Sequence, residues 1–165
     1  GYSPEQSDAL TKAAIEKGYK LEFLEKTGLS KTNEKGSYDF FRGRVIFPIQ
    51  NITGRVLGFG GRTLKTDKKI AKYFNSPESE IYNKSRILYG LYQSKNEIIK
   101  HDECLLVEGY TDVISMHQSG VENVVASSGT ALTEGQIRLV KRYTNNITIL
   151  YDGDAAGIKA SFRGN

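Results

Sequence analysis

The chain has 165 residues, of which 38% are hydrophobic and 25% are charged, so it can bury the core of one or two small globular domains. No apolar run approaches the roughly 18 residues that a membrane helix needs, and no secretory signal is visible at its start. The single cysteine, Cys104, excludes an internal disulfide and begins an apolar run. We therefore expect a buried, reduced thiol and a cytoplasmic protein.

Charge is distributed unevenly along the chain. Residues 1–34 hold 5 basic and 6 acidic side chains, residues 35–100 hold 13 and 5, and residues 101–165 hold 5 and 8, for a net charge of +4. A basic block before an acidic block suits a site that handles a polyanion, with cations for the phosphates and carboxylates for a metal ion. Lysines and arginines that only solvate a surface would give the same basic block.

The first 34 residues are predicted to be helical. Ser3-Pro4-Glu5 is typical of a helix start and Lys17-Gly18 of a helix end, and a second short helix is predicted over residues 21–28. Residues 31–37 are predicted to form a loop. No chemistry is indicated in this segment, so we expect it to pack on the core or to link to an upstream domain.

Short runs of β-prone residues open the basic block. We expect strands over residues 38–41, 44–50 and 55–60, with residues 51–54 as the turn of a hairpin between the last two. Pro48 predicts that its strand is an edge strand or carries a bulge, because proline cannot donate a ladder hydrogen bond.

A polar, lysine-rich loop is predicted over residues 63–70, followed by Lys72-Tyr73-Phe74-Asn75-Ser76-Pro77. This second segment combines a cation, two aromatic rings and amide or hydroxyl groups, which can hold a phosphate and stack on a base. The alternative is a strand with a buried Tyr73/Phe74 pair and a turn after it. Residues 81–100 are predicted to form a basic, amphipathic stretch.

Strands and helices alternate from residue 103 onward, which predicts a parallel sheet. Thr133 and Gln136 fit a capping box at the start of one helix, and a last helix is predicted to begin at Ala155. The predicted strands cover residues 105–108, 121–126 and 147–151, and the helices between them cover residues 112–119 and 133–143.

Three carboxylates follow these predicted strands. Glu108 ends the first strand, and Asp152 and Asp154 follow the third at a spacing that puts both side chains on one side of an extended backbone. Because parallel strands place ligands at their carboxyl ends, we expect a cation among these acids, and Mg²⁺ suits oxygen ligands of this kind. The alternative is that Asp112 or Asp154 only caps a helix.

Glu108-Gly109 followed by Asp152-Gly153-Asp154 resembles the TOPRIM fold, which topoisomerases, primases and some nucleases share. Further segments resemble the catalytic core of bacterial DnaG-type DNA primases, in the right order and over nearly the whole chain from Tyr38 onward. These segments are Arg42-Gly43-Arg44-Val45-Ile46-Phe47-Pro48-Ile49, Gly54-Arg55-Val56-Leu57-Gly58-Phe59-Gly60-Gly61-Arg62, Lys72-Tyr73-Phe74-Asn75-Ser76-Pro77-Glu78, Leu88-Tyr89-Gly90-Leu91, Glu108-Gly109-Tyr110-Thr111-Asp112-Val113 and Ser128-Gly129-Thr130-Ala131-Leu132-Thr133.

The resemblance implies an α/β fold, with a TOPRIM-like parallel βα sheet preceded by a small mixed, basic subdomain of α+β character. We divide the chain into a helical N-terminal segment (residues 1–34), the basic mixed subdomain (residues 35–100) and a TOPRIM subdomain (residues 101–165). The piece is expected to be a partial core. The zinc-binding domain of the family would precede it, and a later acidic motif and a helicase-binding region would follow it.

The implied activity is that of a primase, which uses metal ions to copy single-stranded DNA into short RNA primers during replication. The resemblance implies Glu108, Asp152 and Asp154 as the ligands of Mg²⁺, or of Mn²⁺ as a substitute, with Asp112 as a second-tier acid and no zinc in this segment. The residues implied along the path of template and nucleotide are Arg42, Arg44, Arg62, Lys72, Tyr73, Asn75 and Lys84.

The expected partners are the single-stranded DNA template, ribonucleoside triphosphates, the RNA primer and, through a region outside this piece, the replicative helicase of the primosome. We expect a monomer, no membrane contact, and weak or no activity of the piece by itself. Two alternatives stay open. One is another TOPRIM enzyme, a topoisomerase or a nuclease, and the other is a nucleic-acid-binding module without catalysis.

Overall fold

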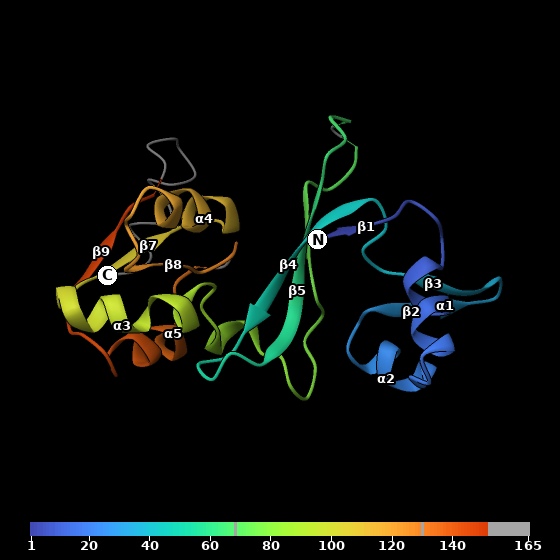
Figure 1. The fold of residues 1–165 in the computed structure, drawn as a ribbon, viewed down its shortest axis with the longest axis horizontal. Helices are drawn as coiled ribbons and strands as arrows, with labels where there is room; N and C mark the ends of the chain where they lie inside the picture. Colours follow the sequence, from blue (N-terminus) through green and yellow to red (C-terminus); the bar gives the residue numbers. More distant parts are fainter. Residues whose placement is uncertain (68, 130, 152–165) are drawn as a thin grey trace. The chain divides into compact units, whose positions relative to one another are not determined.

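The computed structural model describes residues 1–67, 69–129 and 131–151 (Figure 1). The chain divides into two compact units. The first contains Gly1–Ile49 and Val56–Tyr82, and the second contains Gln50–Arg55 and the chain from Asn83 onward. Among the described residues, no helix combines the length and the apolar character needed to cross a membrane.

The first unit is built on an antiparallel sheet with the strand order β1-β4-β5-β6, of which Figure 1 labels the first three strands. These strands are β1 (Tyr2–Ser3), β4 (Arg44–Gln50), β5 (Val56–Thr63) and β6 (Tyr73–Asn75). The hairpin of β4 and β5 is confirmed, with the turn where the sequence predicts it. The expectation that Pro48 lies on an edge strand is wrong, because β4 lies between β1 and β5. Strand β1 pairs with Arg44 and Val45, and Pro48 is exposed beyond that pairing, where a missing N–H donor costs no ladder hydrogen bond with β1.

The N-terminal helices lie beside a two-stranded sheet. Helix α1 covers Ala9–Glu16 and helix α2 covers Leu21–Lys26, and they are followed by the antiparallel strands β2 (Ser30–Asn33) and β3 (Gly36–Asp39). The prediction of a loop over residues 31–37 is therefore wrong. Its polar residues pair across a hairpin whose two end residues, Ser30 and Asp39, are buried.

The predicted helix start at Ser3 is also wrong. Ser3 lies in β1, and α1 begins only at Ala9. The carboxylate of Asp39, from the end of β3, accepts hydrogen bonds from the backbone N–H groups of Leu10 (2.7 Å) and Thr11 (2.9 Å). A side chain distant in sequence thus supplies the cap, because the first N–H groups of a helix need acceptors from outside it.

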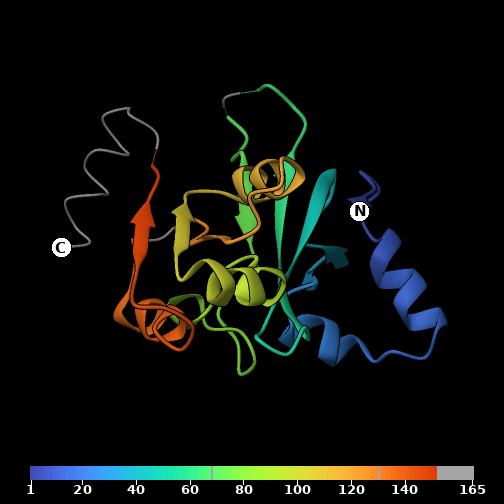
Figure 2. The same ribbon diagram turned by 60° about the vertical axis from the view of Figure 1, so that its left-hand side comes forward.

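The second unit holds a parallel sheet with the order β8-β7-β9, which confirms the predicted βα alternation. Figure 2 shows β7 (yellow) and β9 (red) running in the same direction. The strands are β7 (Cys104–Val107), β8 (Val124–Ala126) and β9 (Ile147–Ile149); the helices are η1 (Lys84–Arg86, a 3₁₀ turn), α3 (Leu91–His101), α4 (Tyr110–Gln118) and α5 (Glu134–Val140). The helix predicted from Ala155 lies outside the described residues.

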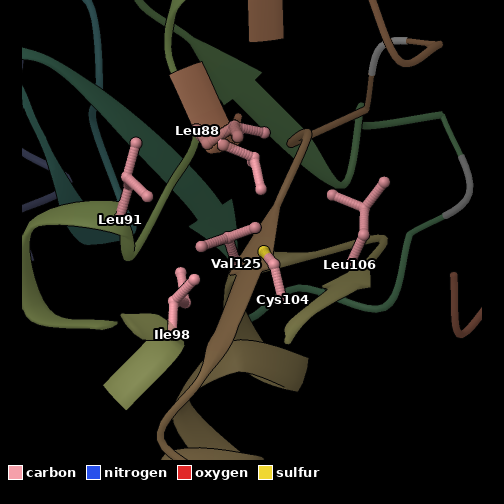
Figure 3. Packing of buried hydrophobic residues seen from close by; sticks show 7 residues of the cluster. Leu88, Leu91, Ile98, Cys104, Leu106 and Val125 are labelled. Carbon is pink, nitrogen blue, oxygen red and sulfur yellow. The ribbon is translucent and has the colours of Figure 1, made fainter. Parts of the chain in front are cut away.

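The core of the second unit surrounds Cys104, at the start of the middle strand. Its sulfur lies among apolar side chains that include Ile98, Leu106 and Val125 (Figure 3). Burial, followed by the nearby charge of Glu103, raises the pKa of the Cys104 thiol to about 12. The expectation of a buried, free thiol is confirmed.

Candidate functional site

Glu108 follows the last residue of the middle strand, β7, as the sequence predicts. Ser127 follows β8 in the same way, and Tyr151 comes two residues after β9. The three side chains therefore come from the carboxyl ends of three parallel neighbours, the edge at which such sheets bind ligands. Glu108 is half-buried, and Ser127 is buried.

The Tyr151 phenol interacts with both of the other groups. Burial raises its pKa, a hydrogen bond with the Ser127 side chain lowers it, and the charge of Glu108 raises it. Glu108 therefore lies within electrostatic reach of the phenol. Sequence reasoning missed Ser127 and Tyr151 as site residues, although Ser127 follows one predicted strand and Tyr151 ends another, which was a signal that could have found them.

Asp112 lies on the first turn of α4. Its Oδ2 accepts a hydrogen bond from the backbone N–H of Gly109 at 2.9 Å, and its side chain is exposed. The helix-capping alternative weighed for Asp112 is thus present in the structure. Asp152 and Asp154 lie outside the described residues, and within residues 1–67, 69–129 and 131–151 no group of three or more His, Cys, Asp or Glu side chains could hold a metal ion.

Arg44 is the most deeply buried of the cations predicted along the path of template and nucleotide. It is buried, and its guanidinium donates hydrogen bonds to the backbone carbonyls of Ala71 (2.8 Å), Gly61 (3.2 Å) and Lys72 (3.2 Å). These carbonyls belong to β5 and to the chain that enters β6. Arg44 therefore holds the segment that leads into β6, whatever else it contacts.

Arg42 is exposed and lies with Arg44 on a cavity of about 220 Å³ in the first unit. Lys65 and Glu5 also line this cavity and form an ion pair at 3.0 Å. Three cations against one carboxylate give the cavity a net positive lining, which suits a phosphate group. Lys65, in the predicted lysine-rich loop, was not among the predicted site residues.

Strand β6 carries Tyr73 and Asn75, both half-buried. Its register places Tyr73 opposite Arg62, whose Nε is buried without a hydrogen-bond partner in the described part of the chain. Lys72 is exposed, with its Nζ 5.9 Å from the centroid of the Tyr73 ring. The alternative is confirmed in its strand, β6, but its buried Tyr73/Phe74 pair is wrong, because Phe74 is 36% exposed.

Lys84 belongs to a different group from the other predicted cations. It opens the 3₁₀ turn η1, in the second unit with Glu108, whereas Arg42, Arg44, Arg62, Lys72, Tyr73 and Asn75 belong to the first unit. The predicted residues thus divide between the two units, and within the described part of the chain the structure shows them gathered only in the first unit, around β5 and β6.

Comparison with known proteins gives concordant results over both units. The model of the family described as DNA primase catalytic core, N-terminal domain, matches residues 1–95, and a Toprim-like model matches residues 105–165. A DNA primase of Halalkalibacterium halodurans is 47% identical over 165 residues, a match that covers 99% of this chain and 27% of that protein. The chain therefore spans about a quarter of the length of this curated relative.

Solved structures agree with the sequence matches. The crystal structure of the RNA polymerase domain of Mycobacterium tuberculosis primase DnaG matches with a TM-score of 0.91 and 38% identity, over 99% of this chain and 55% of that one. A DnaG primase catalytic domain bound to single-stranded DNA matches with a TM-score of 0.86 and 43% identity, over 99% and 50%. With the N-terminal family model matching more than half of its residues, the chain belongs to the family of DNA primase catalytic cores.

Proposed function

We propose that this chain is part of a DNA primase core that copies single-stranded DNA into short RNA primers from ribonucleoside triphosphates. The observation that carries the proposal is Glu108, a half-buried carboxylate directly after the middle strand of the parallel sheet. Membership of the primase family supplies the reaction class, and a relative of 43% identity binds single-stranded DNA.

Carboxylates at the carboxyl edge of the parallel sheet would suit a hard divalent cation. Glu108 contributes carboxylate oxygens, and we assign Asp152 and Asp154, which follow β9, as the further ligands of Mg²⁺ or Mn²⁺. Asp112 has one oxygen engaged with Gly109, so we assign it a secondary role. The bound cation would lower the negative charge that develops on the triphosphate during the reaction.

In the proposed reaction, the 3′-hydroxyl oxygen of the primer bonds to the α-phosphorus of the incoming nucleotide. The bond between that phosphorus and the bridging oxygen breaks, pyrophosphate leaves, and the hydroxyl proton passes to solvent. Protein cations supply positioning and charge. We assign Lys84 to the triphosphate, and Arg42, Arg62, Lys72, Tyr73 and Asn75 to the template and nucleotide path.

Arg44 has a different assignment within the same path. Since its guanidinium already donates to three carbonyls around β6, we propose that it holds Lys72, Tyr73 and Asn75 in place. The remaining expected properties belong to the same proposal: the protein acts as a monomer in the cytoplasm and reaches the replicative helicase through a region outside this segment.

Substitution of the two glutamates that flank strand β7 tests the proposal. Glu108→Gln removes the charge at the carboxyl end of β7, and we expect templated incorporation of ribonucleotides by the intact protein to fall at least 100-fold, roughly the loss typical of a group that stabilises transition-state charge. Glu103→Gln is the matched control. Glu103 is also half-buried, but it precedes β7 and accepts a hydrogen bond from the Thr148 hydroxyl.

The activities of these two variants distinguish the primase from the alternative functions. Loss of RNA synthesis in Glu108→Gln with normal synthesis in Glu103→Gln supports the proposal. Equal activity of the two variants refutes the role of Glu108. Relaxation or cleavage of DNA in place of RNA synthesis would identify another TOPRIM enzyme. DNA binding that is indifferent to Mg²⁺ and to Glu108→Gln would identify a binding module without catalysis.

A further inference from the structure

The first turn of α5 holds the backbone of residues 84–87, the segment that carries Lys84. Gln136, on α5, is fully buried, and its Nε2 donates hydrogen bonds to the carbonyls of Lys84 (3.1 Å) and Ile87 (2.9 Å). Its Oε1 accepts the backbone N–H of Thr133 at 3.1 Å. Both N–H donors of this amide and its oxygen are therefore engaged.

Two neighbours of Gln136 complete the contact with this segment. The Thr133 hydroxyl donates to the carbonyl of Ser85 at 2.6 Å. At Gly135, a Cβ atom would lie 2.6 Å from that same carbonyl oxygen, so glycine permits the close approach of α5. The carbonyls of residues 84, 85 and 87 are thus held by α5 and its N-cap residue, Thr133.

The 3₁₀ turn η1 has no buried residue of its own. A three-residue turn without a buried side chain has little apolar contact to fix its position, because burial supplies most of the stabilisation of local structure. The hydrogen bonds from Thr133 and Gln136 therefore tie this turn to α5, beside the local cap in which the Asn83 side chain accepts the Ser85 N–H.

We propose that Gln136 is a positioning residue for Lys84. By fixing the Lys84 backbone, Gln136 sets where the Lys84 ammonium group meets the phosphates of the incoming triphosphate. This inference rests on the proposed function of Lys84. A misplaced cation loses the charge-assisted hydrogen bond to phosphate, since such bonds depend on short distances. The capping-box pattern in the sequence identified Gln136 only as a helix cap.

The test is a double-mutant cycle in the intact protein with Gln136→Met and Lys84→Ala. Methionine keeps the unbranched stem but removes both donors. We expect Gln136→Met to raise the KM for ribonucleoside triphosphate about tenfold, the change that the loss of one such hydrogen bond produces. In the Lys84→Ala background, Gln136→Met should leave KM unchanged, because interacting residues are not additive.

Ser94→Ala is the matched control. Ser94 is also fully buried in the second unit, and its hydroxyl donates to the carbonyl of Val124 at 2.7 Å. This variant should lower stability in the manner of Gln136→Met but leave KM at the wild-type value. If Gln136→Met does not fold, Gly135→Ala replaces it, because the added methyl group displaces the same segment while Gln136 remains.

Several results would overturn the proposal. These are an unchanged KM in Gln136→Met, an equal rise of KM in both Lys84 backgrounds, a rise of KM in Ser94→Ala, or no effect of Lys84→Ala itself. Absence of RNA synthesis in the wild-type protein would instead refute the proposed function. The triphosphate affinities of the same variants, measured by equilibrium dialysis, would then show whether Gln136→Met weakens binding only when Lys84 is present.

Discussion

The guanidinium carbon of Arg44 lies 3.8 Å from the centroid of the Phe74 ring, while the guanidinium nitrogens donate to three carbonyls of the chain around β6. Phe74 also stacks on Phe40, with their ring centroids 5.5 Å apart. A planar cation can stack and donate at the same time, and lysine cannot reproduce that geometry. Arg44 therefore joins its own strand, β4, to Gly61 of β5 and to the later segment that contains Ala71 and Phe74.

Arg44→Lys should destabilise the first unit although it keeps the charge. Buried carbonyls that lose their donors cost about 1–3 kcal/mol each in mutational data, so we expect a decrease of roughly 3 kcal/mol in the free energy of unfolding, measured by urea denaturation. Arg42→Lys is the control, because Arg42 is exposed, and its effect should stay within about 0.5 kcal/mol. Equal stability of the two variants would remove the structural role assigned to Arg44.

The parts of the fold that the sequence predicts correctly are those set by local pattern. In the β4–β5 hairpin, the side-chain oxygen of Asn51 accepts the backbone N–H groups of Thr53 and Arg55, a turn that short-range residue types specify. The start of α1 depends instead on Asp39, almost thirty residues further along the chain. No local pattern at Ser3-Pro4-Glu5 carries that information, so the helix start was misplaced.

In the candidate site too, local sequence pattern predicts some features and long-range packing determines others. The position of Glu108 follows from an apolar run that ends in a carboxylate, and the structure confirms that position. The contacts of Gln136 with the carbonyls of Lys84 and Ile87 join residues about fifty positions apart. The contacts of Arg44 likewise depend on Ala71 and Phe74, which come about thirty residues later in the chain. Such long-range pairings are properties of packing and cannot be read from residue spacing.

Asp112 offers a way to separate a helix cap from a metal ligand. Asp112→Ala removes the acceptor of the Gly109 N–H and should lower the free energy of unfolding by about 1 kcal/mol. Asp112→Asn keeps an oxygen acceptor, so it should retain nearly wild-type stability while it removes the charge. Urea denaturation of both variants measures this difference.

The Mn²⁺ affinity of the Asp112→Asn variant then tests whether Asp112 is also a metal ligand. We expect a weaker loss of Mn²⁺ binding than in Glu108→Gln, because one Asp112 oxygen is already engaged with Gly109. A loss as large as that of Glu108→Gln would make Asp112 a primary ligand. A wild-type affinity in Asp112→Asn would leave it as a cap alone.

Cys104 predicts a dependence of stability on alkaline pH. The thiol ionises near its ordinary value of 9.0 in the unfolded chain, but in the folded protein its pKa is raised to about 12. Between these values the unfolded state binds fewer protons than the folded state, so the free energy of unfolding should fall as pH rises above about 9. Below pH 9 the contribution of this thiol is fully present.

Cys104→Ala is the variant that isolates this effect. It leaves a small cavity and is less stable at neutral pH, but its free energy of unfolding should decrease less steeply between about pH 9 and pH 11 than that of the wild-type protein. Parallel slopes would contradict the burial of the thiol. Iodoacetamide supplies a second measurement: at pH 8 the folded thiol should react far more slowly than the unfolded one, since only the thiolate attacks.

Gly54 closes the β4–β5 turn against α3. It has φ +85°, and a Cβ atom there would lie 2.8 Å from the Cζ atom of Tyr92. Gly54→Ala therefore carries a backbone cost and a steric cost, and we expect a decrease of about 2 kcal/mol or more in the free energy of unfolding. Gly120 provides the control, because it has φ +87° in the same unit with nothing within 4 Å of its Cβ position.

Gly120→Ala should show the backbone cost alone, about 1 kcal/mol, and the difference between the two variants measures the contact with Tyr92. Adding Tyr92→Ser to Gly54→Ala should recover that difference but not the backbone cost, because serine clears the space while φ stays positive. Full recovery in the double variant would mean that the turn accepts alanine without strain. No recovery would mean that Tyr92 does not limit the turn, and that the approach of residues 51–54 to α3 depends on other contacts, such as the hydrogen bond from Lys95 to the carbonyl of Ile52.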